Sequence, residues 1–365
     1  MKKDTGKPFT PPKLPVDINY IEIIKEIGMA RSSIGELAGL LINIKNPGLL
    51  TIPLLTNEAV LSSRIEGTIA TVEEVFLYEA QNLKKEESEK EKDIQEIINY
   101  RKAIEYALEE LPKKPVSENF IKKLHFILMD SVRGANKSRG NFRKTQVYIG
   151  KHGASLEEAT YIPPIASKIP ELFSNWEQYF HSNKEIDDLV QLGIIHYQFE
   201  AIHPFLDGNG RIGRLLIPLT LFGRKFLPFP LLYISAFFEK HRNEYYKRLN
   251  AVSKNHDWIG WLKFFLLALH EQAINTKEKV TQMVELYERT KIIVGKIHSV
   301  YAIELLDIIH TKPIVTYNSI KSKIGASPQT IYNLIEKFCE LGILEELPGK
   351  KRNKSYVFSE LLRII

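Results

Sequence analysis

The chain has 365 residues, 44% of them hydrophobic and 26% charged, and a formal net charge of +6 at pH 7. This length is enough for two or three domains, and the apolar fraction is ordinary for a soluble protein. The charge is too mild to indicate nucleic acid by itself. The single cysteine, Cys339, excludes an internal disulfide and favours a reducing, cytoplasmic setting.

Two stretches bear on targeting. The chain begins with several lysines, but no apolar run follows them within residues 1–18, so we expect no signal peptide. The most apolar window, residues 259–270, is too short to cross a bilayer and contains Lys263. The sequence therefore predicts no membrane partner.

The N-terminal part is expected to be an extended arm followed by helices. Residues 1–18 are rich in Lys, Pro and Thr, which is typical of a surface arm. Apolar residues recur at helical spacing over residues 20–44, and an Asn-Pro-Gly break follows. A second helix is expected to begin near Thr56 or Asn57, both good N-cap residues, and to end at Gly67.

The next signals are a cap and a charge run. Thr71 with Glu74 predicts a capping box that opens a third helix. The mixed charges of residues 84–93 have no apolar face and predict a solvated loop or helix extension. Helical patterns return at residues 94–111 and 119–132.

Residues 139–164 differ in character, because β-branched and aromatic residues alternate here between glycines. This pattern predicts a short β-hairpin around residues 145–150, the only β feature of the central region. The helices expected after it span residues 169–180 and 189–199, a segment after the glycines near 210, and residues 233–251, 258–269 and 273–297.

Residues 300–365 read as a small separate unit. Three short helices and two strands around a basic turn predict a winged helix-turn-helix. Its use stays open between DNA binding and protein contact, including a homodimer. The excess of positive charge is gathered in residues 350–354, whereas a specific DNA reader usually shows a broader basic face.

The densest cluster of chemical groups is His203-Pro-Phe-Leu-Asp-Gly-Asn-Gly-Arg-Ile-Gly-Arg214. Its glycines allow close approach of a bulky anion, and the N–H groups at the start of the next helix attract negative charge. Arg211 and Arg214 are three residues apart, so both can reach one polyphosphate. Asp207 is placed to hold Mg²⁺, and His203 can accept a proton near neutral pH.

This stretch matches His-x-Phe-x-(Asp/Glu)-Gly-Asn-Gly-Arg-x-x-Arg at every defined position, and the chain resembles the Fic family. Further similarity lies at Leu124-His125, Arg139-Gly140 and Tyr245-Tyr246. The resemblance implies a mainly α fold, with an all-helical Fic core, a β-hairpin called the flap, a helical N-terminal extension and a C-terminal winged helix-turn-helix. The expected division is residues 1–95 for the extension, 96–298 for the catalytic domain and 299–365 for the winged helix.

Members of this family typically transfer AMP from ATP to a protein hydroxyl. The resemblance therefore implies ATP as substrate, Mg²⁺ as cofactor and a protein target that the sequence does not identify. Carried over by position, His203 would deprotonate a Ser, Thr or Tyr hydroxyl, Phe205 would anchor the loop, Asp207 would hold Mg²⁺ and Tyr246 would lie on the adenine side. The phosphate-binding set would be Gly208, Asn209, Gly210, Arg211, Ile212, Gly213 and Arg214, and the flap residues that align the target by strand pairing would be Val147, Tyr148, Ile149 and Gly150.

A second pattern, Ser62-Ser-Arg-Ile-Glu66-Gly67, matches the family's inhibitory pattern (Ser/Thr)-x-x-x-Glu-(Gly/Asn). Ser62 and Glu66 are one helical turn apart and face the same way. The resemblance implies that Glu66 pairs with Arg214 and displaces the γ phosphate, so that ATP binds only unproductively. An autoinhibited enzyme is expected, and removal of AMP by the same site stays open.

Two other functions compete with AMP transfer. The chain is alternatively a transcription regulator that senses nucleotide and reads DNA with its tail, or it transfers another phosphate-containing group. The intact glycines and both arginines favour ATP and AMP over other groups. His125 and His196 are interpreted as structural, because no cysteine or carboxylate near them has metal-ligand spacing.

Overall fold

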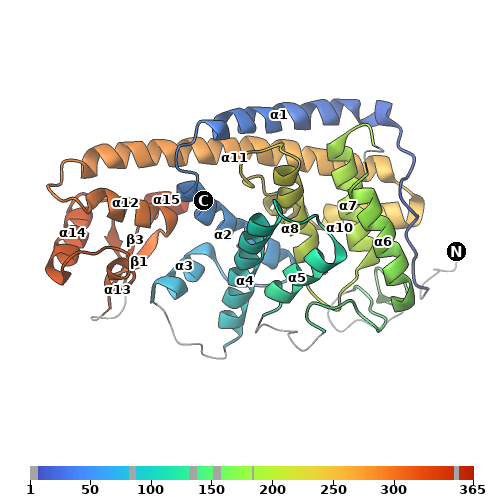
Figure 1. Cartoon of the computed structure of the whole chain (residues 1–365), viewed down its shortest axis with the longest axis horizontal. Coiled ribbons are helices and arrows are strands. Elements are labelled where there is room, and N and C mark those ends of the chain that lie inside the picture. Colours follow the sequence, from blue (N-terminus) through green and yellow to red (C-terminus); the bar gives the residue numbers. More distant parts are fainter. Residues whose placement is uncertain (1–6, 82–87, 131–137, 151–157, 183–184, 349–352) are drawn as a thin grey trace.

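Helix α11 (Trp258–Val294) runs along most of the molecule in this computed structural model and joins its two ends (Figure 1). Helix α1 (Ile24–Ile42) packs along it, and the other central helices lie on the opposite side of α11. The structure describes residues 7–81, 88–130, 138–150, 158–182, 185–348 and 353–365.

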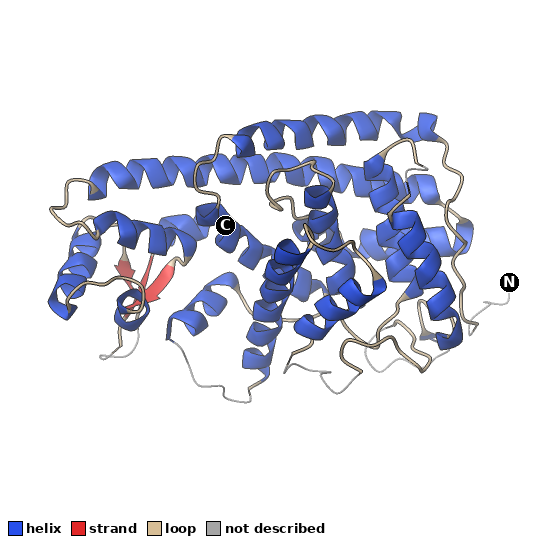
Figure 2. Cartoon of the chain, in the orientation of Figure 1, coloured by secondary structure: helices blue, strands red, loops and turns tan. Residues whose placement is uncertain are grey.

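Helices make up nearly all of the regular structure, as Figure 2 shows. The central region further contains η1 (Tyr20–Ile23), α2 (Gly48–Ile65), α3 (Val72–Gln81), α4 (Glu89–Glu110), α5 (Glu118–Leu128), η3 (Ala166–Lys168), α6 (Ile169–Phe180), α7 (Asp188–Ile202), α8 (Asn209–Gly223), α9 (Ser235–Lys240) and α10 (Arg242–Asn255). The C-terminal unit contains α12 (Ala302–Thr311), β1 (Ile314–Thr316), α13 (Tyr317–Lys321), α14 (Pro328–Glu340), β2 (Glu345–Glu346), β3 (Ser355–Val357) and α15 (Ser359–Ile364).

The mainly α fold is confirmed, and so are several local signals. The Thr71 hydroxyl accepts from the Glu74 amide at 3.2 Å while the Glu74 carboxylate accepts from the Thr71 amide at 3.0 Å, which is the expected capping box. Gly67 takes φ +105° directly after the end of α2, a conformation that favours glycine. None of the helices that the structure describes combines the length and apolar character needed to cross a bilayer.

The predicted start of the second helix was wrong. α2 begins at Gly48, eight or nine residues before the expected caps, with Pro47 as its N-cap. Thr56 does not cap a helix but donates its hydroxyl to the Ile52 carbonyl at 2.7 Å within α2. Pro53 lies inside the helix, and α2 is buried along much of its length, so tertiary packing outweighs the local breaker signal.

Two more helix boundaries differ. The two helices expected at residues 258–269 and 273–297 are the single helix α11, which ends at Val294. The helix expected at residues 233–251 is divided into α9 and α10 at His241. The first part of α11 packs against α7, α9 and α10, whereas its later part packs against α12 and α15. The sequence of α11 is apolar on all sides in its first part and amphipathic in its later part. This change in pattern reflects the change of neighbours and does not mark a break in the helix.

The C-terminal unit follows the predicted order of helices and adds a strand. β1 and β2 both pair antiparallel with β3, giving a three-stranded sheet of order β1-β3-β2. The sequence did not indicate β1 or α15. The assignment to a winged helix-turn-helix and the domain limits stay predictions, although the proposed limit at residue 95 falls inside α4.

One carboxylate of the charge run is not solvated. Asp93 is 4% exposed and accepts from the Ile69 amide at 3.0 Å, so it holds the segment between α2 and α3. Residues 84–87 of this run lie outside the described part. Residues 89–93 form the first turn of α4, in agreement with a helix extension, but the burial of Asp93 corrects the prediction that this segment is solvated.

Candidate active site

The loop between α7 and α8 carries the predicted base. α7 ends at Ile202, and His203 follows in the left-handed region with φ 48° and ψ 61°. The chain then turns over six residues into α8, with Gly208 at φ +77° as its N-cap. Because a helix leaves its first N–H groups without intrahelical partners, the start of α8 at Asn209 and Gly210 attracts an anion.

Asn209 holds this loop closed. Its side-chain oxygen accepts from the Phe205 amide at 2.8 Å, and its side-chain nitrogen donates to the Phe205 carbonyl at 2.9 Å. The ring of Phe205 is fully buried, which confirms its expected role as an anchor. Asn209 therefore does more than present its main-chain amide to a phosphate.

His125 supports the same loop from α5. Its ring stacks on Phe205 at a centroid distance of 3.8 Å. Nδ1 accepts from the Gly140 amide at 2.9 Å, so Nε2 carries the proton and donates to the Asp207 carbonyl at 3.0 Å. Burial lowers the pKa of His125 to about 4, which keeps this tautomer at neutral pH. The structural interpretation of His125 agrees with these contacts.

Arg143 is a residue that the sequence did not single out. It is 2% exposed, and its guanidinium donates to the carbonyls of His203 at 2.9 Å, Pro164 at 2.6 Å and Thr145 at 3.1 Å. Its amide also donates to the Pro204 carbonyl at 2.9 Å. Arg143 therefore joins the segment before the flap to the catalytic loop.

The imidazole of His203 is partly buried beside this guanidinium. Burial and the charge of Arg143 lower the pKa of His203 to about 4. Nδ1 is a buried atom without a hydrogen-bond partner among the described residues. At neutral pH the ring is therefore uncharged and able to accept a proton.

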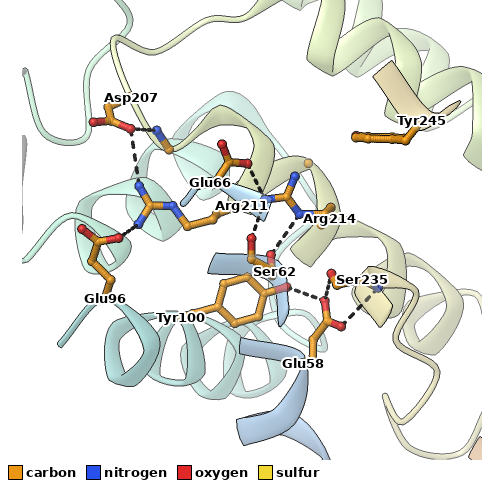
Figure 3. Close-up of polar contacts among 12 residues, drawn as sticks. Glu58, Ser62, Glu66, Glu96, Tyr100, Asp207, Arg211, Arg214, Ser235 and Tyr245 are labelled. Carbon is orange, nitrogen blue, oxygen red and sulfur yellow. Dashed lines mark hydrogen bonds and ion pairs between the residues drawn. The ribbon is translucent and has the colours of Figure 1, made fainter. Parts of the chain in front are cut away.

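The two arginines of the motif point to different partners. Arg211, 3% exposed, donates from Nη1 to Glu96 of α4 at 2.7 Å and from Nη2 to Asp207 at 3.4 Å. Arg214, 2% exposed, turns toward α2 instead (Figure 3). Each arginine thus pairs with carboxylate or hydroxyl oxygens in this arrangement, and the expectation that both reach one polyphosphate stays a prediction.

The inhibitory pattern lies directly on Arg214. Nε of Arg214 donates to the Ser62 hydroxyl at 3.0 Å, and Nη2 donates to the Ser62 carbonyl at 2.9 Å and to Oε1 of Glu66 at 2.5 Å (Figure 3). Burial opposes ionisation of Glu66 and is the largest single effect, but the charge and the hydrogen bond of Arg214, together with the charge of Arg211, outweigh it and lower the pKa of this carboxyl. The pair is therefore ionised and charge-assisted.

Glu66 also lies against the start of α8. A Cβ atom added to Gly210 would meet Oε1 of Glu66 at 2.3 Å and Nη1 of Arg214 at 2.8 Å. The carboxylate thus occupies the space above the helix N-terminus where a phosphate oxygen would bind. About a third of the Glu66 side chain, 34%, stays exposed, so the carboxylate lies at the rim of the site.

A buried polar cluster fixes α2 behind this contact. Glu58 is 2% exposed and accepts from the hydroxyls of Tyr100 at 3.1 Å and Ser235 at 2.5 Å (Figure 3). Burial raises the pKa of Glu58 to about 7 despite these donors. Three separate helices, α2, α4 and α9, meet at this carboxyl, and they set the position of Ser62 one turn further along.

Asp207 is the only predicted metal ligand. Its Oδ1 accepts from the Gly208 amide at 2.7 Å, and its side chain is 34% exposed. The described residues contain no group of three or more His, Cys, Asp or Glu side chains arranged for a metal. Mg²⁺ is usually bound through one or two carboxylates together with substrate phosphates, so a single carboxylate beside the phosphate site fits it.

Few contacts of the predicted flap and of Tyr246 fall within the described residues. Ile149 forms an antiparallel bridge with Tyr161, with N···O distances of 2.8 and 3.1 Å, and Tyr148 is 48% exposed. The rest of the predicted hairpin, residues 151–157, lies outside the described part. Tyr246 lies near Glu66 and Arg214, which affect its pKa, whereas Tyr245 is buried and bonds His196 at 2.9 Å.

His196 closes a chain of contacts under α8. Its Nδ1 lies 3.1 Å from the Gly213 carbonyl and its Nε2 2.9 Å from the Tyr245 hydroxyl. Burial lowers the pKa of His196 to about 3, so it is neutral and structural, in agreement with the sequence interpretation. Sequence reasoning missed Arg143, Glu96 and Glu58, because each acts through a partner far along the chain.

Fold and site together define an α-helical protein with a glycine-containing helix N-terminus, a neutral histidine beside it and, in contact with it, a glutamate from the end of a preceding helix. Family profiles agree: that of the Fic/DOC family N-terminal region matches residues 24–109 and that of the Fic/DOC family matches residues 115–221. The chain belongs to the Fic/DOC family.

Curated relatives match part of the chain. The protein adenylyltransferase Fic of Culex quinquefasciatus is 31% identical over 117 residues, which are 32% of this chain and 20% of the relative. That of Drosophila grimshawi is 26% identical over 155 residues, 40% of this chain and 29% of the relative. The similarity thus spans less than a third of either relative.

Solved structures share the fold. A Fic family protein from Desulfovibrio desulfuricans G20 has a TM-score of 0.57 at 22% identity and covers 96% of this chain and 98% of its own. Fic-1 of C. elegans, residues 134–508, has a TM-score of 0.56 at 19% identity and covers 72% of this chain and 74% of its own. The likeness to the first structure includes the C-terminal part of the chain.

Proposed function

We propose that this protein transfers AMP from ATP to a Ser, Thr or Tyr hydroxyl of a protein, and that Glu66 holds the site inactive. The observation that carries the proposal is the contact of Glu66 with both Arg214 and the start of α8, next to a neutral His203. The names of the curated relatives support adenylyl transfer.

The residues act in a simple order. His203 takes the proton of the attacking hydroxyl, and the new bond forms between that oxygen and the α phosphorus while pyrophosphate leaves. The main-chain amides at the start of α8 and the guanidinium of Arg211 stabilise the charge that develops on the phosphate oxygens. Mg²⁺, when bound at Asp207, would neutralise the phosphates.

Glu66 opposes this order electrostatically and sterically. Its carboxylate neutralises Arg214 and lies where a phosphate oxygen would contact Gly210. In a triphosphate bound through Arg214, the negative γ phosphate would lie against the Glu66 carboxylate. Two negative charges at such short range repel each other. ATP therefore binds in an unproductive pose until Glu66 moves away.

The test is intact mass spectrometry of the Glu66→Gly protein incubated with ATP and Mg²⁺. A gain of one AMP residue that is absent from the parent supports the proposal, and the Glu66→Gly, His203→Ala protein is the control that should gain nothing. Equal labelling of parent and Glu66→Gly proteins contradicts the inhibitory role. No labelling of either protein, even with candidate target proteins added, contradicts AMP transfer.

The competing function is DNA recognition by the C-terminal unit with the nucleotide site as a sensor. The observation that favours it is the exposed face of α14, which begins with Pro328 after the cap Ser327. Salt-dependent binding of duplex DNA, unchanged in His203→Ala, would support this function.

A further inference from the structure

A carboxyl group next to the phosphate site has no role in the function proposed above. Glu200 lies on α7, one helical turn before His203. Its Oε1 is a buried atom without a hydrogen-bond partner among the described residues. An unpaired buried carboxyl oxygen is costly, so this atom needs a further partner, such as ordered water or a group of a bound ligand.

The position of this group is set by a glycine. A Cβ atom added to Gly213 would lie 2.2 Å from Oε1 of Glu200, so only glycine at this position lets the carboxyl rest on α8. Gly213 is three residues after Gly210, about 4.5 Å further along the helix axis. The carboxyl therefore lies one turn beyond the helix start at which the phosphates bind.

Electrostatic neighbours connect Glu200 with the groups of the site. Burial raises the pKa of Glu200 to about 7, Arg214 opposes this rise and Glu66 adds to it. The pKa values of Tyr245 and Tyr246 are raised in part by the charge of Glu200. Glu200 is therefore close enough to Arg214, Glu66 and both tyrosines for their charges to interact.

We propose that Glu200 is a specificity residue that accepts hydrogen bonds from the ribose hydroxyls of the bound nucleotide. The proposal rests on the nucleotide transfer proposed above. A ribose is joined directly to the α phosphate, so its 2′ and 3′ hydroxyls reach about one helical turn from the phosphate, whereas the base lies further away. Carboxylates are the usual acceptors for ribose hydroxyls in nucleotide sites.

Glu66 and Glu200 then have opposite effects on nucleotide binding. Glu66 competes with the phosphates for Arg214, whereas Glu200 has an oxygen that gains a partner only when the nucleoside is present. Removing Glu66 also removes a negative charge that disfavours ionisation of Glu200, which makes Glu200 a better acceptor.

The test measures nucleotide binding by calorimetry in the full chain carrying Glu66→Gly and His203→Ala, so that the site is accessible and no transfer occurs. The ligands are ATP, 2′-deoxyATP, 3′-deoxyATP and ITP, which lacks the 6-amino group of adenine. We expect ATP to bind about tenfold to a hundredfold more tightly than at least one deoxy analogue. Glu200→Met should weaken ATP binding to the level of that analogue and leave the analogue's own affinity unchanged.

Matched variants separate recognition from structure. Gly213→Ala, which pushes the carboxyl away, should reduce the preference for the ribose hydroxyl in the same way, whereas Glu105→Gln, an exposed residue of α4, should keep it. If Glu200→Met weakens all four ligands equally, its role is structural and the proposal is overturned.

The failures remain distinguishable. Equal affinity for ATP and both deoxy analogues overturns the role of Glu200 alone, even if no variant of Glu200 folds. Suppose instead that ITP binds more weakly than ATP, that both deoxy analogues bind as tightly as ATP, and that Glu200→Met removes the difference between ATP and ITP. Glu200 then contacts the base, and the ribose assignment is overturned. If none of the four nucleotides binds, the proposed AMP transfer fails as well.

Discussion

The side-chain nitrogen of Asn57 donates to the main-chain carbonyl of Ile365 at 2.8 Å, which ties the middle of α2 to the end of the C-terminal unit. The same unit holds α3, because the Thr316 hydroxyl donates to the Ala80 carbonyl at 2.9 Å. Ile314 and Val357 pack on Phe76 in a small separate apolar cluster. The helix that carries Ser62 and Glu66 is therefore held from outside the central region as well as from within it.

This connection predicts that weakening the C-terminal contact loosens α2. Asn57→Ala removes one hydrogen bond at a partly buried place, at a cost of about 1 kcal/mol. Thr316→Val removes two, because the Thr316 hydroxyl also accepts from the Ser319 amide at 3.1 Å as the N-cap of α13, so its cost is expected to be larger. We expect faster hydrogen exchange of the amides in Gly48–Ile65 and faster AMP labelling than in the parent. Asn318→Ala, a substitution nearby on α13, is the control. Hydrogen-exchange rates in α2 of Asn57→Ala and Thr316→Val that equal those of the parent would contradict the connection.

Gly210→Ala tests whether ATP binds with a phosphate in the space at the start of α8. The added methyl group would lie 2.3 Å from the present position of the Glu66 carboxylate and on the path of a phosphate. In the Glu66→Gly background we expect ATP affinity to fall at least about tenfold, because a displaced charge-assisted hydrogen bond is worth about 1.5–3 kcal/mol. Gly223→Ala, at the other end of the same helix with nothing within 4 Å, should bind ATP as tightly as the background protein.

The site shows which parts of a fold a sequence can predict. His203 to Arg214 and Ser62 to Gly67 are local patterns in which every chemical group is close in the chain, so each pattern could be recognised in the sequence. Their contact joins residues 148 positions apart and was implied only by the resemblance to the Fic family. The partners of Arg211 and the role of Arg143 could not be predicted, because Glu96 lies 115 residues from Arg211 and the carbonyls bonded by Arg143 become neighbours only in the folded chain.

The same distinction explains the helix boundaries. Thr71 and Glu74 form their cap within four residues, and the sequence predicted it correctly. The start of α2 depends instead on burial of the helix against α4, α9 and α12, which outweighs the presence of Pro53. Local propensity therefore identified the Thr71 cap correctly but misplaced the cap of α2, where burial of the helix decides the boundary.

Glu96→Ala should be strongly destabilising, although it removes a single carboxylate. Glu96 and Arg211 are 4% and 3% exposed and 2.7 Å apart, so the substitution leaves a buried guanidinium without its nearest partner. We expect the free energy of unfolding to fall by about 3 kcal/mol in urea titrations. Adding Arg211→Met should restore part of the loss, whereas a double variant that is less stable than Glu96→Ala would show that the pair is not the cause.

The low pKa of His203 predicts an unusual pH profile for AMP transfer. Burial and the Arg143 charge lower this pKa from the ordinary value near 6.5 to about 4, so the base is neutral at any pH above about 5 and becomes protonated only below it. In the Glu66→Gly protein, kcat/KM reports the free enzyme and should lose its base only below about pH 5. Glu66 itself raises this pKa, so its removal does not shift the acid limb upward. Arg143→Met should move the limb to higher pH and lower stability, although burial of the imidazole still holds its pKa down. An acid limb near pH 6.5 in the Glu66→Gly protein would contradict the burial of the base.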